Sequence, residues 1–367
     1  MILRHLPVTR RNILISNAEP VKIKNYYIAA MRSFFHILLL SIISVAAYAQ
    51  DIVILEKKAN ISLRGLSVVD DRVVWVSGSN GSVGKSIDGG KSWRWFQVKG
   101  FEKNDFRDIE AFDEKTAVIM AVSEPAYILK TFNGGESWKM VYSDSVKGIF
   151  LDAMEFWENG NGIAVGDPVD GLLYVTRTDD FGNSWEKYVS KKMSQPEKGE
   201  AMFASSGTNI RRLSNQEAIV VTGGTKSRLL IHERWIDLPL IQGSETTGAN
   251  SVAIWNSPPR KSNIVVVGGD FRNDTSSYKN CAWSTDMGKR WNIPAIPPHG
   301  YRSCVEFINW DKLLACGTSG VDISEDGGKT WKLISSESFH VCRKSKSGNA
   351  VFLAGANGQI AILKKFF

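Results

Sequence analysis

The chain has 367 residues, of which 43% are hydrophobic, 10% aromatic and 23% charged. This is ordinary globular composition and excludes an intrinsically disordered chain. The formal net charge is +7, but residues 1–49 carry six Lys or Arg and one Glu, so a chain without them has 39 basic and 37 acidic residues. So small an excess of basic residues does not provide the dense basic surface that binding to nucleic acid requires. We therefore expect no nucleic-acid partner.

Residues 31–49 have the organisation of a signal peptide. Met31-Arg32 begins a short basic region, an apolar run extends from Phe34 to Val45, and Ala47-Tyr48-Ala49 has the small-x-small form of a cleavage site. The run is short of the roughly 20 apolar residues that a membrane span needs. Residues 1–30 show no apolar period, and we expect them to be a non-native upstream extension. Residues 50–367 are then a single exported domain, periplasmic or extracellular.

A motif of the form [ST]-x-[DN]-x-G-x-x-W occurs five times in the chain. The copies are SIDGGKSW (Ser86 to Trp93), TFNGGESW (Thr131 to Trp138), TDDFGNSW (Thr178 to Trp185), STDMGKRW (Ser284 to Trp291) and SEDGGKTW (Ser324 to Trp331). Their Trp residues lie about 40–50 positions apart except for one double gap, a spacing that indicates a repeat architecture. We expect a degenerate copy in the gap, with Trp235 in the role of the Trp.

Short apolar runs precede each motif. They are four to six residues long, β-branched and bounded by Gly, Asn or Asp, which predicts strands. Four antiparallel strands in 40–50 residues is the period of a propeller blade. The sequence therefore predicts an all-β, seven-bladed β-propeller of four-stranded antiparallel blades, with six or eight blades as the alternatives. The expected blades lie near residues 60–98, 107–142, 148–190, 199–240, 249–292, 300–335 and 338 to the C-terminus.

The two ends of the predicted domain complement each other. The last repeat stops at AILKKFF without an outer strand, and DIVILEK (Asp51 to Lys57) is a strand without a blade. If these segments pair, the ring closes and no sheet edge is left exposed. We therefore expect the N-terminal strand to close the ring.

The motif suits the turn between the third and fourth strands of a blade. An Asp or Asn side chain can accept hydrogen bonds from the amides of its own turn, Gly allows a positive φ, and Trp buries a large flat surface. We therefore assign structural roles to Asp88, Trp93, Asn133, Trp138, Asp180, Trp185, Asp286, Trp291, Asp326 and Trp331.

The five motifs resemble the Asp boxes of bacterial neuraminidase (BNR) repeats. The stretches Gly166 to Trp185, Gly199 to Ile210, Gly300 to Ile308 and Gly317 to Trp331 resemble exported propellers related to the photosystem II stability and assembly factors. The resemblance implies a monomeric module that binds a protein or glycan partner, with possible peripheral association with a membrane complex and without a cofactor. It also implies that ligands meet the face where first strands begin and second strands end.

That face carries roughly one polar residue per blade. At the starts of the first strands we expect Arg64, Arg107, Asp108, Asp152, Glu200, Asn250, Arg302 and His340. The ends of the second strands add Glu124, Asp167 and Asp270. A ring of mixed charge could bind a polar ligand or a charged loop of a partner. The alternative is a channel mouth whose charges satisfy one another.

The competing function is a sialidase-like glycoside hydrolase acting at the same face. Such an enzyme would use Arg64, Arg107 and Arg302 for the substrate carboxylate, Tyr301 as nucleophile, and Asp152 or Asp167 as acid/base. The Arg-Ile-Pro signature of sialidases is absent, and the best-known sialidase propellers have six blades. No GxGxxG follows a strand, no HExxH is present, and the five His show no metal spacing, so we expect neither cofactor nor metal.

Four cysteines fall in the last quarter of the chain without CxxC spacing. Cys304 and Cys316 could lie opposite each other on adjacent strands that turn near Trp310. In an exported protein they could form a disulfide, and buried free thiols are the equally acceptable alternative.

Overall fold

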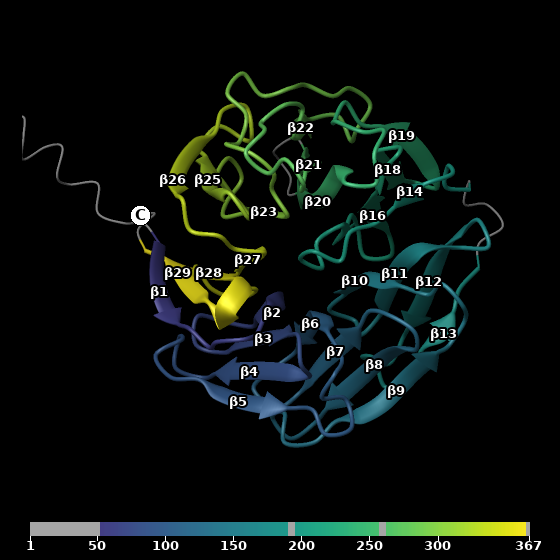
Figure 1. The fold of residues 1–367 in the computed structure, drawn as a ribbon, viewed down its shortest axis with the longest axis vertical. Coiled ribbons are helices and arrows are strands. Elements are labelled where there is room, and N and C mark those ends of the chain that lie inside the picture. Colours follow the sequence, from purple (N-terminus) through teal and green to yellow (C-terminus); the bar gives the residue numbers. More distant parts are fainter. Residues whose placement is uncertain (1–51, 190–194, 257–261, 365–367) are drawn as a thin grey trace, which may run out of the picture. The chain divides into compact units, whose positions relative to one another are not determined.

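The computed structural model describes residues 52–189, 195–256 and 262–364. These residues form seven antiparallel sheets arranged in a ring around a central axis (Figure 1), and we call the region along this axis the channel. The predicted seven-bladed propeller is confirmed. The predicted extension and signal peptide, residues 1–49, lie outside the described residues. Within the described residues, no helix has the length and apolar character that crossing a membrane would require.

The blades follow one another in chain order, and the first strand of each lines the channel (Figure 1). Blade 1 consists of β2 (Leu63–Val68), β3 (Val74–Gly78), β4 (Ser82–Ser86) and β5 (Arg94–Gln97). Blade 2 consists of β6 (Phe106–Ala111), β7 (Ala117–Ala121), β8 (Ala126–Thr131) and β9 (Lys139–Asp144). Blade 3 consists of β10 (Leu151–Phe156), β11 (Gly162–Val169), β12 (Leu172–Thr178) and β13 (Glu186–Lys187).

The remaining blades include one departure from the four-stranded pattern. Blade 4 consists of β15 (Ile210–Arg212), β16 (Ala218–Val221), β18 (Arg228–Ile231) and β19 (Arg234–Asp237). Blade 6 consists of β23 (Cys304–Phe307), β24 (Leu313–Gly317), β25 (Gly320–Ser324) and β26 (Lys332–Ser335). Blade 7 consists of β27 (Val341–Lys344), β28 (Val351–Ala354), β29 (Ile360–Leu363) and β1 (Ile52–Glu56). Blade 5 contains β20 (Thr247–Trp255), β21 (Asn263–Asp270) and β22 (Cys281–Ser284), and the short strands β14 (Glu200–Ala201) and β17 (Gly223–Gly224) extend its inner edge. In place of its fourth strand, a single bridge joins Trp283 to Asn292.

The two ends of the propeller meet in blade 7. Strand β1 pairs antiparallel with β29, with Ile52 opposite Leu363 and Ile54 opposite Ala361. The N-terminal strand therefore supplies the outer strand of the last blade, as predicted. Because β1 covers the edge of β29, strands from both ends of the chain hold the ring closed.

Each of the five motifs forms a self-contained turn. In the first, the Ser92 amide donates to Asp88 Oδ1 (2.9 Å) and the Gly90 amide donates to Ser86 Oγ (2.9 Å). Gly89 and Gly90 have φ of +74° and +83°, a region that favours glycine. Hydrogen bonds from Ser92 and Ser86 lower the pKa of Asp88 to about 2. The motif carboxylate is thus occupied by its own turn.

The motifs also connect neighbouring blades. Trp331 of blade 6 packs in one cluster with Val265 of blade 5, and Trp185 of blade 3 packs in one cluster with Val118 of blade 2. A Cβ placed on the second motif glycine of blade 6, Gly328, would lie 3.0 Å from a Val265 methyl group. The turn therefore approaches the preceding blade closely, and its Trp fills the space between the two sheets.

Candidate functional site at the central channel

The first strands of four blades begin with a β-bulge. The register shifts between Leu63 and Gly65, between Phe106 and Asp108, between Leu151 and Ala153, and between Ala249 and Ser251. The extra residues are Arg64, Arg107, Asp152 and Asn250, all of which the sequence proposed for the site. A bulge re-aims its side chain relative to the regular pleat. The mouth of the channel at the starts of the first strands, hereafter the bulge mouth, owes its polar lining to these bulges.

The three arginines proposed for a substrate carboxylate have three separate partners. Arg302 is fully buried and donates from Nε to Asp322 Oδ2 at 2.7 Å. Arg107 Nε lies 2.8 Å from Asp105 Oδ2, and Arg64 donates to the carbonyl of Ser205 (3.4 Å). The guanidinium groups are therefore engaged in different contacts and do not form a common carboxylate clamp.

Other polar groups of the bulge mouth are also engaged within the protein. Tyr301 is buried, and its hydroxyl donates to Asn250 Oδ1 (2.8 Å). Glu200 was predicted at the start of a first strand, but it lies in β14, which pairs with β17, whereas the first strand of blade 4 is β15. There Arg228 Nε donates to Glu200 Oε1 (3.0 Å). Burial, with nearby Arg64 and Arg107, lowers the pKa of His340 to about 3. The imidazole is therefore neutral at physiological pH.

Two carboxyl groups of the bulge mouth hold protons unusually tightly. Burial, followed by the neighbouring Asp167, raises the pKa of Asp152 well above its usual value. Burial also raises the pKa of Asp167 to about 6, although its Oδ1 accepts a hydrogen bond from the Met202 amide (2.8 Å). Asp152 is completely buried, and Tyr301 is turned toward Asn250. The geometry therefore gives the sialidase-like arrangement no support.

Residues 203–208, hereafter the plug, fill the channel behind the bulge mouth. Ser205 Oγ donates to Asn250 Oδ1 (3.1 Å) in blade 5, and Ser206 Oγ donates to the Ser303 carbonyl (2.7 Å) at the start of blade 6. From the other side, Arg343 of blade 7 donates to the Gly207 carbonyl (3.2 Å). Residues 204–208 are all buried. The channel behind the bulge mouth is thus occupied by the chain's own backbone.

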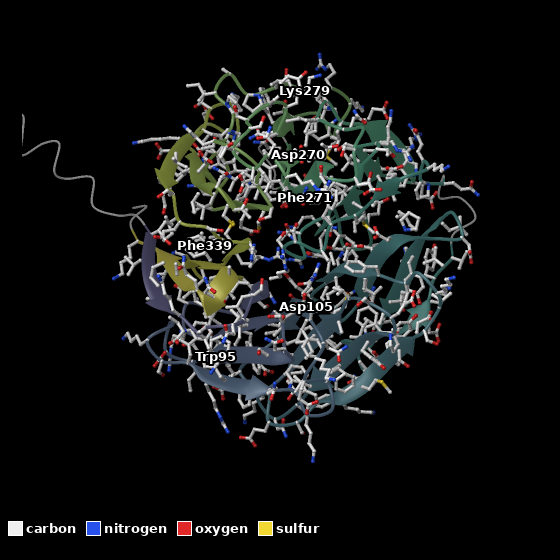
Figure 2. The ribbon with its side chains drawn as sticks, viewed as in Figure 1. Trp95, Asp105, Asp270, Phe271, Lys279 and Phe339 are labelled. Atoms are coloured by element: carbon white, nitrogen blue, oxygen red, sulfur yellow. The ribbon has the colours of Figure 1, made fainter. Side chains whose placement is uncertain are left out.

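Two residues predicted for the site, Glu124 and Asp270, lie away from the plug and its contacts. Glu124 is exposed and accepts a hydrogen bond from the Gly148 amide, and Asp270 Oδ1 accepts one from the Arg272 amide (3.0 Å). Figure 2 shows Asp105 and Phe271 near the centre of the ring and Asp270 further out. Phe271 is 43% exposed and packs on Phe203 and Tyr301, so an aromatic ring covers the plug at this mouth. Whether the predicted residues contact a partner stays a prediction.

The opposite mouth opens into a pocket of about 680 Å³. We call it the charged mouth, because one register position of each first strand contributes to a ring around it. The seven residues are Ser67, Glu110, Glu155, Arg211, Ala253, Glu306 and Arg343, paired respectively with Trp75, Val118, Ile163, Ile219, Val265, Leu314 and Phe352 of the second strands. Five of the seven are charged, with both signs present.

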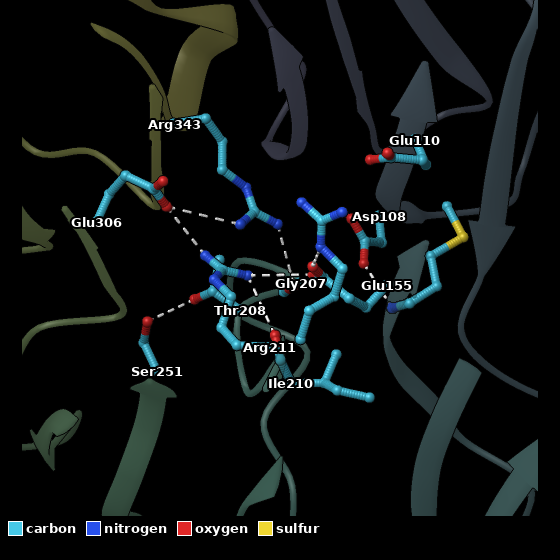
Figure 3. Close-up of polar contacts among 12 residues, drawn as sticks. Asp108, Glu110, Glu155, Gly207, Thr208, Ile210, Arg211, Ser251, Glu306 and Arg343 are labelled. Atoms are coloured by element: carbon cyan, nitrogen blue, oxygen red, sulfur yellow. Dashed lines mark hydrogen bonds and ion pairs between the residues drawn. The ribbon is translucent and has the colours of Figure 1, made fainter. Parts of the chain in front are cut away.

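Ion pairs connect the charged residues across blades (Figure 3). Arg211 Nη2 lies 3.1 Å from Glu306 Oε2, and Arg211 Nη1 lies 3.7 Å from Glu155 Oε2. Arg343 Nη1 lies 3.8 Å from the same Glu306 oxygen. Burial raises the pKa of Glu306, while Arg211 and Arg343 act to lower it. The ring is therefore a partly desolvated network in which Arg211 pairs with two acids and Arg343 shares one of them.

The rim of the charged mouth combines long basic side chains with aromatic rings. Lys346 Nζ lies 2.6 Å from Glu110 Oε1, Arg212 Nε lies 3.3 Å from Glu155 Oε1, and both basic side chains are more than 40% exposed. The aromatic residues that line the pocket are Phe112, Phe156, Trp157, Phe181, Trp255 and Phe307. Aromatic and arginine side chains are the ones enriched in protein interfaces.

Sequence reasoning did not identify the charged mouth. The resemblance implied a ligand at the starts of the first strands, which lie at the other end of the channel. The available signal was a charged residue next to the end of several first strands, as in DIEA, DAMEF, IRR and VEFI. Periodicity alone does not say that these residues share one level of a ring, since that depends on the register between blades.

Comparisons with known proteins support the fold. No protein-family model matches the chain, and no curated protein matches it. Among solved structures, "YCF48 bound to D1 peptide" is 18% identical with a TM-score of 0.58, covering 86% of this chain and 96% of that one. YCF48 from Cyanidioschyzon merolae is 14% identical with a TM-score of 0.58, covering 86% and 99%. The propeller of U3-55K is 15% identical with a TM-score of 0.59, covering 86% and 98%. At these identities the likeness concerns the fold.

Proposed function

We propose that this protein is an exported, non-enzymatic binding module that takes a segment of a protein partner at the charged mouth. The observation that carries the proposal is the pocket of about 680 Å³ with its ring of Glu and Arg and its aromatic rim. A propeller scaffold fixes the ring through the registers of its first strands. A site held by backbone register loses little freedom when a ligand binds.

The chemistry of the charged mouth favours a peptide over a simple anion or cation. Glu110, Glu155 and Glu306 can accept hydrogen bonds from a partner, while Arg211 and Arg343 can donate them. Ring charges of both signs suit a segment that carries both signs or backbone amides and carbonyls. The aromatic rim can bury apolar side chains beside those polar contacts. A similar propeller that was solved with a bound D1 peptide is consistent with this mode.

Position-specific photocrosslinking tests the proposal. A photoreactive phenylalanine analogue replaces Trp255 at the charged mouth, and in a matched protein it replaces Tyr278, which is 62% exposed on the loop between β21 and β22 near the other face. We expect envelope extract to give one partner crosslinked from position 255, with the crosslinked peptide identified by mass spectrometry. Charge reversal of the rim by Arg212→Glu and Lys346→Glu should abolish that product, whereas Lys139→Glu on the outer strand β9 should not.

Three outcomes would overturn the proposal or part of it. A partner captured equally from positions 255 and 278, or one insensitive to the rim reversals, would remove the charged mouth as the site. Turnover of fluorogenic glycosides that is lost in Asp152→Ala would contradict the non-enzymatic assignment. Recovery of an intact chain beginning at Met1 from the cytosol, instead of a chain beginning at Gln50 from the envelope, would contradict export.

A further inference from the structure

Three cysteine side chains converge in the core between blades 6 and 7. Cys304 (β23) lies directly opposite Cys316 (β24), as the sequence suggested, and Cys342 (β27) comes from the next blade. The three Sγ atoms all lie within 4.8 Å of one another, and Cys304 Sγ and Cys342 Sγ are 3.7 Å apart. All three residues are free thiols with no exposed surface.

The spacing of the three sulfur atoms matches that of metal ligands. An equilateral triangle with sides of 3.7–4.8 Å has its centre about 2.1–2.8 Å from each corner, a range that brackets the roughly 2.3 Å of a metal–thiolate bond. A cation at the centre would therefore reach bonding distance of all three sulfurs with shifts of a few tenths of an ångström.

Polar groups of neighbouring segments hold the Cys304 sulfur in place. The Cys342 amide donates to Cys304 Sγ (3.4 Å), and the Thr208 hydroxyl lies 3.7 Å from the same sulfur. The Cys304 thiol also lies 3.3 Å from the Cys342 carbonyl oxygen. These contacts fix the position of the sulfur between blades 6 and 7.

We propose that Cys304, Cys316 and Cys342 form a three-coordinate thiolate site for a soft monovalent metal ion, Cu(I). Soft thiolate ligands select Cu(I) and Zn²⁺, but structural Zn²⁺ sites are almost always four-coordinate. Among the described residues no His, Cys, Asp or Glu supplies a fourth ligand atom to this group. Cu(I) binds as the thiols lose their protons to solvent, and neither the metal nor the sulfurs change oxidation state.

The plug separates the site from the channel. Thr208 belongs to the plug, and its hydroxyl lies between Cys304 Sγ and Ser251 Oγ (2.6 Å). Figure 3 shows Gly207 and Thr208 close to Arg211 of the charged mouth. A local opening of the plug would expose Cys304 to the channel without separating the blades.

The fourth cysteine provides a matched control. Cys281 (β22) is buried like the other three, and burial raises the pKa of its thiol, but it packs among aliphatic and aromatic residues of blades 5 and 6. Its thiol has the same chemistry and is equally buried, but it does not belong to the group of three neighbouring sulfur atoms. If cysteines in this protein serve only to fill the core, Cys281 and Cys342 should behave alike.

Metal titration of the reduced full-length protein tests the site. Cu(I) is supplied anaerobically in competition with the chromogenic chelator bicinchoninate, and bound metal is counted by elemental analysis. We expect one Cu(I) per chain, a sulfur-to-copper charge-transfer band in the ultraviolet, and no stoichiometric Zn²⁺ under the same conditions. Cys342→Ser and Cys316→Ser should weaken Cu(I) binding at least tenfold, and Cys281→Ser should leave it unchanged. Near-ultraviolet circular dichroism checks that each variant is folded.

The opposing results are equally specific. Cu(I) binding that is unchanged in a folded Cys342→Ser variant, or lost equally in Cys281→Ser, would overturn the site. Stoichiometric Zn²⁺ uptake with tetrahedral coordination in X-ray absorption would contradict the three-coordinate Cu(I) assignment. A native chain whose mass shows a disulfide within the trio, and which takes up no Cu(I) before reduction, would replace the metal site with a redox-active pair.

Discussion

Blades 6 and 4 differ in the turn between their third and fourth strands. In blade 6, residues 325–330 separate β25 from Trp331, and Asp326 organises the turn. In blade 4 only His232 and Glu233 separate β18 from β19, and both have positive φ, of 50° and 59°. Two positive φ values in a two-residue connection are typical of a type I′ hairpin. Blade 4 therefore has a tight turn where the other has a motif.

This difference changes how each blade packs on the one before it. Trp331 is 3% exposed in the core between blades 5 and 6. The sequence assigned the same role to Trp235, which does pack against the cluster between blades 3 and 4, but it lies opposite Leu230, two residues after the turn. A groove of about 810 Å³ between blades 3 and 4 is lined by residues that include Trp157, Tyr188 and His232. The motif therefore fills the space between blades, which the short turn of blade 4 does not.

The largest expected effect comes from removing the motif tryptophan. Trp331→Ala should lower the free energy of unfolding by about 3–5 kcal/mol, because it leaves a large cavity between two sheets. Trp235→Ala, at a half-buried position, should cost about half as much or less. Urea denaturation followed by far-ultraviolet circular dichroism measures both. Equal costs would contradict the view that the two blades pack differently.

The second largest loss of stability is expected from replacing the motif glycine. Gly328 has φ of +94° and approaches Val265 closely, so Gly328→Ala introduces both backbone strain and a steric contact, at a cost of about 2–3 kcal/mol. Gly171 in the β11–β12 turn also has a positive φ of +78°, but no heavy atom lies within 4 Å of a Cβ placed there. Gly171→Ala should therefore cost only the strain, about 1 kcal/mol. Thermal unfolding that ranks the two in the reverse order would exclude close packing of the motif on the preceding blade.

A smaller effect is expected from the motif carboxylate. Asp326 accepts hydrogen bonds from the amides of Lys329 and Thr330 (both 2.9 Å) and from the Thr330 hydroxyl (2.6 Å). Asp326→Ala should cost about 1–2 kcal/mol, because those donors lose their partner. In blade 4, Glu217→Ala removes only an exposed contact to His232 and should cost less than about 1 kcal/mol. Chemical denaturation of the two variants side by side checks the ranking.

The sequence predicted the features that depend on local patterns. Apolar runs bounded by turn residues located the seven blades, and the unpaired segment at Asp51 to Lys57 predicted ring closure. Cys304 and Cys316 were foreseen as neighbours because they flank one hairpin. Cys342 was not, because it joins them only through the register between blades 6 and 7. The plug was missed for the same reason, since its partners come from several other blades.

The candidate site depended even more on contacts between distant residues. Arg302 was expected to face a ligand, but its partner Asp322 lies on the third strand of its own blade, buried beside it. Arg211, Glu155 and Glu306 come from three blades, and only the common register places them in one ring. Spacing along the chain cannot distinguish a charge that faces a ligand from one that is already paired.

The smallest expected effect concerns the pH dependence of the free energy of unfolding. Burial acts to raise the pKa of Asp180 in the blade 3 motif, but hydrogen bonds from Ser184 and Thr178 lower it to about 2. A carboxylate whose pKa is lower in the folded than in the unfolded state stabilises the protein above pH 4, and this stabilisation is lost as the pH falls toward 2. Asp180→Asn should therefore destabilise the protein at pH 6 by under about 1 kcal/mol, since the group is partly exposed, and less at pH 2.5. Asn133 takes the same place in the blade 2 motif and carries no titratable group, so Asn133→Ser should leave the shape of the pH profile unchanged. Unfolding midpoints in urea between pH 2.5 and 6 measure the difference, and parallel profiles for Asp180→Asn and the unsubstituted protein would show that the motif carboxylate contributes nothing to acid sensitivity.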